Sequence, residues 1–223
     1  MVKIIMKSTI YLIYGLGANR RAFRKLKFSE DLNCIYLDWI LPLPNETLAS
    51  YALRLSKSID TSKPFYLIGL SFGGMLTTEI AKQLNPLHAF LISSAAVFNE
   101  LPWYFKTAGK LRLERIVPFN LMKTCNSIGL KFLGAKTQDE KLLLKQLIVD
   151  SDPRFIKWAL TCILNWRNTI RPSNLTCIHG NADRLLPIRY INPDFVIDGG
   201  SHFMVYARAD EIMKIIMDEI NRH

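Results

Sequence analysis

Cysteine is scarce in this chain, and long apolar runs and low-complexity segments are missing. The cysteines are Cys34, Cys125, Cys162 and Cys177; they form no CxxC pair and have no metal-ligand spacing, so we interpret them as reduced thiols. No apolar run approaches the roughly 20 residues that a membrane-spanning helix needs. No helix-turn-helix, zinc-finger or RNP-like pattern is found, which argues against a nucleic-acid partner.

What is present fits one globular α/β domain covering residues 1–223. Of its 223 residues, 49% are hydrophobic and 22% are charged. The net charge of +10 is concentrated in residues 100–171, which carry 13 basic and 6 acidic side chains. This excess indicates either solvated helix faces or an acidic partner or anionic substrate, and composition alone does not separate them.

The N-terminal stretch 9–18 follows Lys3 and Lys7 and superficially resembles a short signal peptide. It ends in a Tyr-Gly-Leu-Gly turn at residues 14–17, which a cleavage there would remove. We therefore interpret it as a core strand and expect the protein to be cytoplasmic.

Short apolar runs alternate with helical patterns along the whole chain, which is typical of a mainly parallel sheet covered by helices on both faces. The expected strands are residues 9–14, 34–38, 65–70, 89–93, 175–179 and 195–198. Helix signals include Asn45 before an apolar stripe, Asn85-Pro86 at a helix end, and a stripe of isoleucines at 207–220.

Residues 97–171 contain helical patterns and no convincing strand. Thr137 and Glu140 form a capping box, and Asp152-Pro153 is typical of an N-cap followed by proline at the first helical position. A crossover between parallel strands needs only a dozen or so residues. We therefore expect a helical lid insertion over residues 98–152, after the fourth strand, with the crossover helix following it at 153–166.

The chemical signal is the motif Gly69-x-Ser71-x-Gly73, which lies between an expected strand and an expected helix. A sharp strand-to-helix turn lifts the serine hydroxyl above the sheet and requires glycine where a side chain would meet neighbouring backbone. It also leaves the amide of Phe72 at the helix N-terminus, where developing negative charge is favoured.

A nucleophilic serine needs a histidine base and a carboxylate that orients the histidine. His202 lies in a glycine-flanked loop after the last expected strand, where sites in parallel sheets gather. Asp183, just after the fifth strand, is the first choice for the carboxylate, with Asp38 and Glu100 as rivals. The chain order Ser71, Asp183, His202 is the one that accompanies this type of turn.

These motifs, in this order, resemble those of the α/β-hydrolase fold, in particular its small, capped, esterase-like members, and the resemblance covers essentially the whole chain outside the lid. It implies Ser71 as nucleophile, His202 as general base and Asp183 as its orienting acid. The second oxyanion donor would be the backbone NH of Leu16, beside that of Phe72. The chain has Tyr14-Gly15 where the family often has His-Gly, and it lacks two strands that commonly precede the first one.

Only 19 positions separate Asp183 from His202, so the helix between the last two strands should be reduced to about one turn. The expected activity is hydrolysis of a carboxylic ester or thioester through an acyl-enzyme, without metal or cofactor. Lid aromatics are candidates for an acyl pocket: Trp103, Tyr104, Phe105, Phe119 and Trp158.

Three alternatives stay open. A non-hydrolytic, lyase-type enzyme can use the same fold and triad, since the fold does not determine the reaction. A type II thioesterase acting on acyl chains bound to an acidic carrier protein would suit the basic middle region. A non-catalytic binding protein is the third, and the complete set of triad residues argues against it.

Overall fold

The computed structural model describes residues 8–112 and 127–222. Six strands form one sheet in the order β2-β1-β3-β4-β5-β6, and every neighbouring pair is parallel. The strands are β1 (Thr9–Ile13), β2 (Asn33–Leu37), β3 (Phe65–Leu70), β4 (His88–Ile92), β5 (Leu175–Gly180) and β6 (Phe195–Ile197). The predicted fold class is confirmed, and each strand begins and ends within two residues of its expected position.

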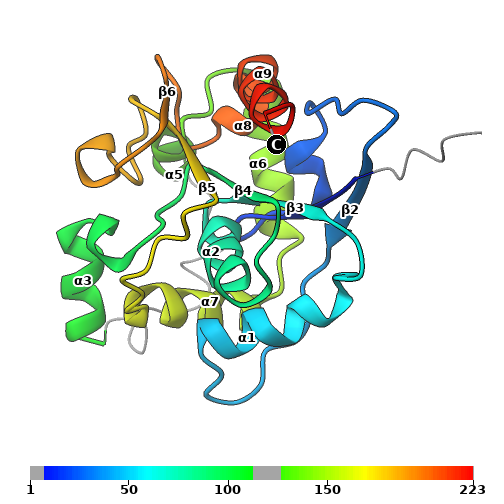
Figure 1. The fold of residues 1–223 in the computed structure, drawn as a ribbon. Helices are drawn as coiled ribbons and strands as arrows, with labels where there is room; N and C mark the ends of the chain where they lie inside the picture. Colours follow the sequence, from blue (N-terminus) through cyan, green and yellow to red (C-terminus); the bar gives the residue numbers. More distant parts are fainter. Residues whose placement is uncertain (1–7, 113–126, 223) are drawn as a thin grey trace, which may run out of the picture.

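Helices cover both faces of the sheet (Figure 1). One face packs against α1 (Leu48–Leu55), α2 (Phe72–Leu84) and α7 (Pro153–Asn165), and the other against α8 (Met204–Ala207) and α9 (Ala209–Ile220). Side chains of β1 alternate between the two cores: Tyr11 and Ile13 face the first, Ile10 and Leu12 the second. Both faces of the central strands are therefore apolar, as expected for a covered parallel sheet.

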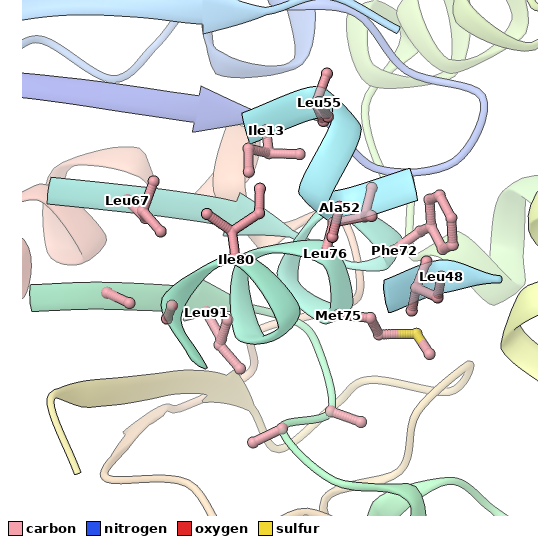
Figure 2. Packing of buried hydrophobic residues seen from close by; sticks show 14 of the residues in the cluster. Ile13, Leu48, Ala52, Leu55, Leu67, Phe72, Met75, Leu76, Ile80 and Leu91 are labelled. Carbon is pink, nitrogen blue, oxygen red and sulfur yellow. The ribbon is translucent and has the colours of Figure 1, made fainter. Parts of the chain in front are cut away.

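The first core includes the contact between the sheet and the helix that follows Ser71. Figure 2 shows Leu67 of β3 and Leu91 of β4 in the same cluster of side chains as Leu76 and Ile80 of α2. All four side chains are fully buried. Burying apolar area contributes about 25 cal/mol per Å², so this packing fixes α2, and with it the turn that precedes α2, against the strands.

The cap of α1 differs from the sequence-based interpretation. Thr47, and not Asn45, is the N-cap: its hydroxyl accepts a hydrogen bond from the amide of Ser50, and the Ser50 hydroxyl accepts one from the amide of Thr47. Asn45 instead adopts a left-handed conformation with φ 57° in the preceding turn, which asparagine tolerates better than most residues. Both residue types suit a cap, so composition alone did not place the helix start.

Between β4 and β5, the regular secondary structure of the described residues is entirely helical. These are η3 (Phe98–Glu100), α3 (Trp103–Lys110), α5 (Ser127–Leu133), α6 (Gln138–Val149) and α7. The capping box of Thr137 with Glu140 and the N-cap at Asp152 are confirmed. Leu143, Leu144 and Leu147 of α6 belong to the second core, and α7 packs with α1 on the first.

Two features of the C-terminal third were predicted from the sequence. The isoleucine stripe expected at 207–220 lies on α9, which begins at Ala209 because Arg208 leaves the helical conformation at φ −128° and separates α9 from α8. The connection from β5 to β6 carries only the short 3-10 helix η5 (Ile188–Tyr190), which confirms the expected single turn. Among the described residues, no helix is both long and apolar enough to span a bilayer.

Candidate active site

Ser71 lies at the turn between β3 and α2. Its backbone has φ 51° and ψ −118°, outside the regions that L-residues ordinarily occupy. Three hydrogen bonds hold this conformation: the Ser71 amide donates to the carbonyl of Ile92 at 2.9 Å, the Gly74 amide donates to the Ser71 carbonyl at 2.8 Å, and the Ser94 hydroxyl donates to the same carbonyl at 2.7 Å. A strained backbone at this position is typical of a functional turn whose surroundings hold it in place.

The two glycines of the motif are required because other backbone segments lie too close to them to leave room for a side chain. A Cβ at Gly69 would lie under 3.0 Å from the carbonyl oxygen of Gly73, and one at Gly73 would lie under 3.0 Å from those of Ile13 and Tyr14. Backbone atoms cannot move aside as the end of a flexible side chain can. The expectation that the motif needs glycine at both positions is confirmed.

His202 and Asp183 complete a hydrogen-bonded chain with Ser71. The His202 Nε2 lies 2.9 Å from Ser71 Oγ, and its Nδ1 lies 2.8 Å from Asp183 Oδ2. The loops that carry them, after β5 and after β6, are joined by a hydrogen bond from the Ala182 amide to the Gly200 carbonyl at 2.9 Å. The three side chains therefore have the spacing of a nucleophile, a base and an orienting acid.

The Asp183 carboxylate is buried, and both of its oxygens are hydrogen-bonded. Its other oxygen, Oδ1, accepts hydrogen bonds from the amides of Leu185 at 2.8 Å and Leu186 at 2.9 Å. Burial raises the pKa of Asp183, but the charge of His202 and the hydrogen bonds from His202 and Leu186 outweigh it and hold the pKa below its ordinary value. Asp183 is therefore ionised at neutral pH and directs the Nδ1–H of His202 toward itself.

The rival carboxylates have other partners. Asp38 accepts a hydrogen bond from the Tyr14 hydroxyl at 3.0 Å. Glu100 accepts the amides of Ala96 at 2.6 Å and Asn192 at 3.2 Å. Neither has an ion pair or hydrogen bond with a histidine in the described part of the chain, so the geometry favours Asp183 among the three candidates.

The other two described histidines, His88 and His179, bond to other groups. His88 Nε2 lies 2.8 Å from the Thr176 hydroxyl, and His223 lies outside the described residues. His179 is fully buried at the end of β5, with Nε2 2.8 Å from the Leu186 carbonyl and 3.5 Å from Asp183 Oδ2. Since a carbonyl only accepts, this bond requires a proton on Nε2, and burial lowers the pKa of His179.

The backbone amides expected to hold an oxyanion lie beside Ser71. Leu16 follows β1 in a turn that is closed by a hydrogen bond from the Ala18 amide to the Gly15 carbonyl at 3.0 Å. A Cβ on Gly15 would lie 3.4 Å from the Cβ of Ser71. Neither Leu16 N nor Phe72 N donates to an acceptor within residues 8–112 and 127–222. Both residues line the same pocket as Ser71 and His202, and Phe72 is the first residue of α2, where the helix dipole favours negative charge.

This pocket has a volume of about 260 Å³ and a largely aliphatic wall. Its polar side chains are Ser71, Ser94 and His202, all on one side. The opposite wall comes from residues inserted between β4 and β5: Leu133, Leu144, Leu147, Ile148, Leu160 and Ile163. No acidic or basic side chain other than His202 lines it, so it suits an uncharged apolar group.

The expectation that lid aromatics line the pocket holds for one of the four described candidates. Phe105 lines the pocket, whereas Trp103, Tyr104 and Trp158 do not. Trp103 is 63% exposed, Tyr104 donates its hydroxyl to the Leu185 carbonyl at 2.8 Å, and Trp158 lines a separate cavity of about 770 Å³. Phe119 lies outside the described residues. The side chain of Trp158 stacks in the first core on Tyr51 and Phe155, because α7 turns this face toward α1.

Sequence reasoning missed two supporting residues, Ser94 and His179. Ser94 follows β4 and holds the Ser71 carbonyl; Gly74 leaves room for it, because a Cβ there would lie under 3.0 Å from the Ser94 side chain. Both residues lie at the carboxyl ends of parallel strands, the edge where sites of such sheets gather. Their position at these strand ends was the signal by which the sequence could have identified them. Within the described residues, no group of histidine, cysteine, aspartate or glutamate side chains is arranged to hold a metal ion.

Comparison with known proteins agrees with this fold. A family model described as a thioesterase domain matches residues 42–98, and no curated protein matches the chain. A lipase-esterase related protein from Clostridium acetobutylicum aligns with TM-score 0.71 and 21% identity, over 95% of this chain and 94% of that one. An esterase from Exiguobacterium antarcticum gives TM-score 0.73 and 13% identity, with coverages of 96% and 92%.

A bromoperoxidase from Bacillus anthracis has the same arrangement, with TM-score 0.66 and 15% identity over 96% of this chain and 92% of that one. Together with the parallel sheet, the strained serine turn and the hydrogen-bonded Ser71, His202 and Asp183, these likenesses define the class. The chain has the α/β-hydrolase fold, and its similarities are to esterases, lipases and a thioesterase domain.

Proposed function

We propose that the protein is a serine hydrolase that cleaves a carboxylic ester or thioester. The observation that carries this proposal is the continuous chain of hydrogen bonds from Ser71 Oγ through His202 to Asp183, at 2.9 and 2.8 Å. His202 Nε2 takes the proton of Ser71 as the hydroxyl oxygen attacks the substrate carbonyl. Asp183 keeps the other ring proton on Nδ1 and stabilises the imidazolium that forms.

The amides of Leu16 and Phe72 would hold the oxyanion of the tetrahedral intermediate. His202 then returns its proton to the leaving alcohol or thiol, which leaves an acyl group on Ser71. Water, deprotonated by His202, resolves the acyl-enzyme in the same way. Removing one donor from such a hole typically costs on the order of 100-fold to 1000-fold in turnover, so the placement of both amides contributes substantially to the rate.

The pocket favours an acyl group that is apolar and of moderate length. A water-sized group occupies about 30 Å³, so a volume of about 260 Å³ holds roughly eight such groups, and a methylene is of similar size. The aliphatic wall offers no partner for a charge or an amide in the acyl chain. An uncharged medium-length acyl ester or thioester is therefore the substrate that fits.

The decisive test is covalent labelling with a fluorophosphonate. Wild-type protein should be labelled on Ser71 and should hydrolyse medium-chain nitrophenyl esters, whereas Ser71→Ala should do neither and should keep its circular dichroism spectrum. Ser62→Ala is the control, because Ser62 is exposed, lies outside the pocket and bonds to Asp60. Labelling that persists in Ser71→Ala, or is lost in Ser62→Ala as well, would refute the assignment.

A thioesterase acting on a carrier-bound acyl chain is the narrower version of this proposal. It is supported by the thioesterase-domain match over residues 42–98 and by the basic excess in residues 100–171. Steering by exposed charges is screened beyond roughly 8 Å at physiological ionic strength. The kcat/KM for an acidic carrier-linked substrate should therefore fall with salt, and Lys141→Glu with Lys145→Glu should remove that dependence. An equal response of a neutral ester to salt would exclude an acidic partner.

A non-hydrolytic reaction is the alternative in another class. One structural neighbour is described as a bromoperoxidase, so similar folds are associated with different chemistries. Identification of the products from a panel of esters would separate the two, since hydrolysis releases an acid and an alcohol or thiol. We also propose a cytoplasmic location, which fits Cys34, Cys162 and Cys177 being free thiols; fractionation of the source cells tests it.

A further inference from the structure

A second, basic concavity of about 300 Å³ lies where α5 meets the loops after β5 and β6. Three of its lining residues are cations: Lys131 at the end of α5, Lys136 just after it, and Arg184 after β5. The remaining lining residues, including Gly134 and Ser201, are uncharged, and no carboxylate is among them. The concavity is therefore strongly positive at neutral pH.

The three cations differ from most arginines on this surface because they have no acidic partner. Arg21 pairs with Asp150, Arg24 with Asp139, and several other arginines likewise pair with carboxylates. The side chains of Lys131, Lys136 and Arg184 form no hydrogen bond or ion pair with any other described residue. Like charges that line one concavity repel one another, and an anion placed among them would relieve that repulsion.

The turn after α5 brings the two lysines to the same concavity. Gly134, at φ 82°, ends the helix in a Schellman motif: the Ala135 amide donates to the Leu130 carbonyl at 3.0 Å and the Gly134 amide to the Lys131 carbonyl at 3.1 Å. These bonds occupy carbonyls that would otherwise present negative charge at the helix end. The three full positive charges outweigh the partial negative charge, about half an elementary charge, at the C-terminal end of the helix.

The concavity and the catalytic pocket are lined by neighbouring residues of the same loops. Ser201 lines the concavity and His202 the pocket; Arg184 lines the concavity and Leu185 the pocket. Gly134 packs directly on Ser201, where a Cβ would lie under 3.0 Å from the serine side chain, and the Phe203 amide donates to the Leu133 carbonyl at 3.0 Å. A group bound among the cations would therefore lie beside the two loops that carry Asp183 and His202.

We infer that this concavity binds a phosphate group, and that the group belongs to the leaving portion of the substrate while the acyl chain occupies the aliphatic pocket. Phosphate fits better than carboxylate, because it carries up to two negative charges and offers oxygens to three separate cations. The role in substrate recognition rests on the proposed hydrolase activity. The binding of phosphate does not.

The first experiment measures binding without catalysis. Inorganic phosphate is titrated into the full-length protein at constant ionic strength, followed by calorimetry and by amide chemical shifts near Gly134 and Ser201. The test variant is Lys131→Gln, Lys136→Gln, Arg184→Gln; the matched control, Lys27→Gln, Lys57→Gln, Lys63→Gln, removes three charges from exposed positions outside this concavity. We expect at least about tenfold weaker binding in the test variant, in line with exposed charge pairs of modest strength, and no change in the control. Equal binding by all three proteins would overturn the site.

The second experiment distinguishes a phosphate on the substrate from free phosphate. Octanoyl thioesters of pantetheine and of 4′-phosphopantetheine differ by a single phosphate. We expect the test variant to lose about tenfold in kcat/KM for the phosphorylated thioester and to stay within twofold of wild type for the other. Equal effects on both thioesters would overturn the role in substrate recognition and leave a site for free phosphate. Phosphate binding by a protein that is neither labelled by a fluorophosphonate nor able to hydrolyse nitrophenyl esters or either thioester would overturn the proposed hydrolase activity and leave the binding site standing.

Discussion

Replacement of Asp183 by asparagine tests the most specific feature of the site, the tautomer of His202. The wild-type carboxylate accepts three hydrogen bonds, two from the amides of Leu185 and Leu186 on Oδ1 and one from His202 Nδ1 on Oδ2. Asparagine has a single oxygen. In one orientation this oxygen accepts from the two amides, and the NH₂ group faces His202. In the other orientation the oxygen accepts from His202, and the NH₂ group faces the two N–H donors.

The structure favours the first orientation. The second leaves two buried donors without an acceptor, at roughly 1–3 kcal/mol each. In the first orientation the NH₂ group donates to Nδ1, so the proton of the ring moves to Nε2 and points at Ser71. A histidine in that tautomer cannot take the serine proton. A loss of about 10⁴ in kcat is expected, which corresponds to about 5 kcal/mol of transition-state stabilisation.

The assay is kcat for a medium-chain nitrophenyl ester, together with the downfield proton resonance of His202 Nδ1–H, which should disappear in Asp183→Asn. Asp38→Asn is the matched control, since Asp38 bonds to Tyr14 and not to a histidine. Wild-type circular dichroism would confirm that the variant is folded. A loss of less than about tenfold in a folded Asp183→Asn protein would refute the tautomer argument.

Two further predictions concern the wall of the pocket and a buried histidine. Leu144→Trp should shift the optimum of an acyl-chain-length series toward shorter chains, because Leu144 of α6 lines the pocket, whereas Leu142→Trp on the exposed face of α6 should leave it unchanged; identical optima would contradict the assigned pocket. Burial lowers the pKa of His179, so below about pH 6.5 the unfolded chain takes up a proton that the folded protein does not. The free energy of unfolding should therefore fall as pH drops below about 6.5, and His179→Gln should show a flatter dependence in urea titrations; equal slopes would rule out His179 as the source.

Much of the fold was determined by local sequence patterns. A buried parallel strand is a short run that is apolar on both faces, so each of the six strands was visible without knowledge of its neighbours. The serine turn was equally local: Gly69 and Gly73 are required because β1 and α2 approach within contact distance of the turn. Chain order then pointed to Asp183 and His202.

Other features were decided by contacts between distant segments, which local patterns do not encode. Asp183, Asp38 and Glu100 are all plausible carboxylates by position, and only the fold places the first against His202 and gives the other two different partners. The pocket wall is aliphatic because α6 turns Leu144 and Leu147 toward Ser71, while α7 turns Trp158 into the first core. Which face of a lid helix meets a cavity depends on how the whole helix packs, and this is why its pattern of apolar residues predicted burial without predicting what the buried residues would line.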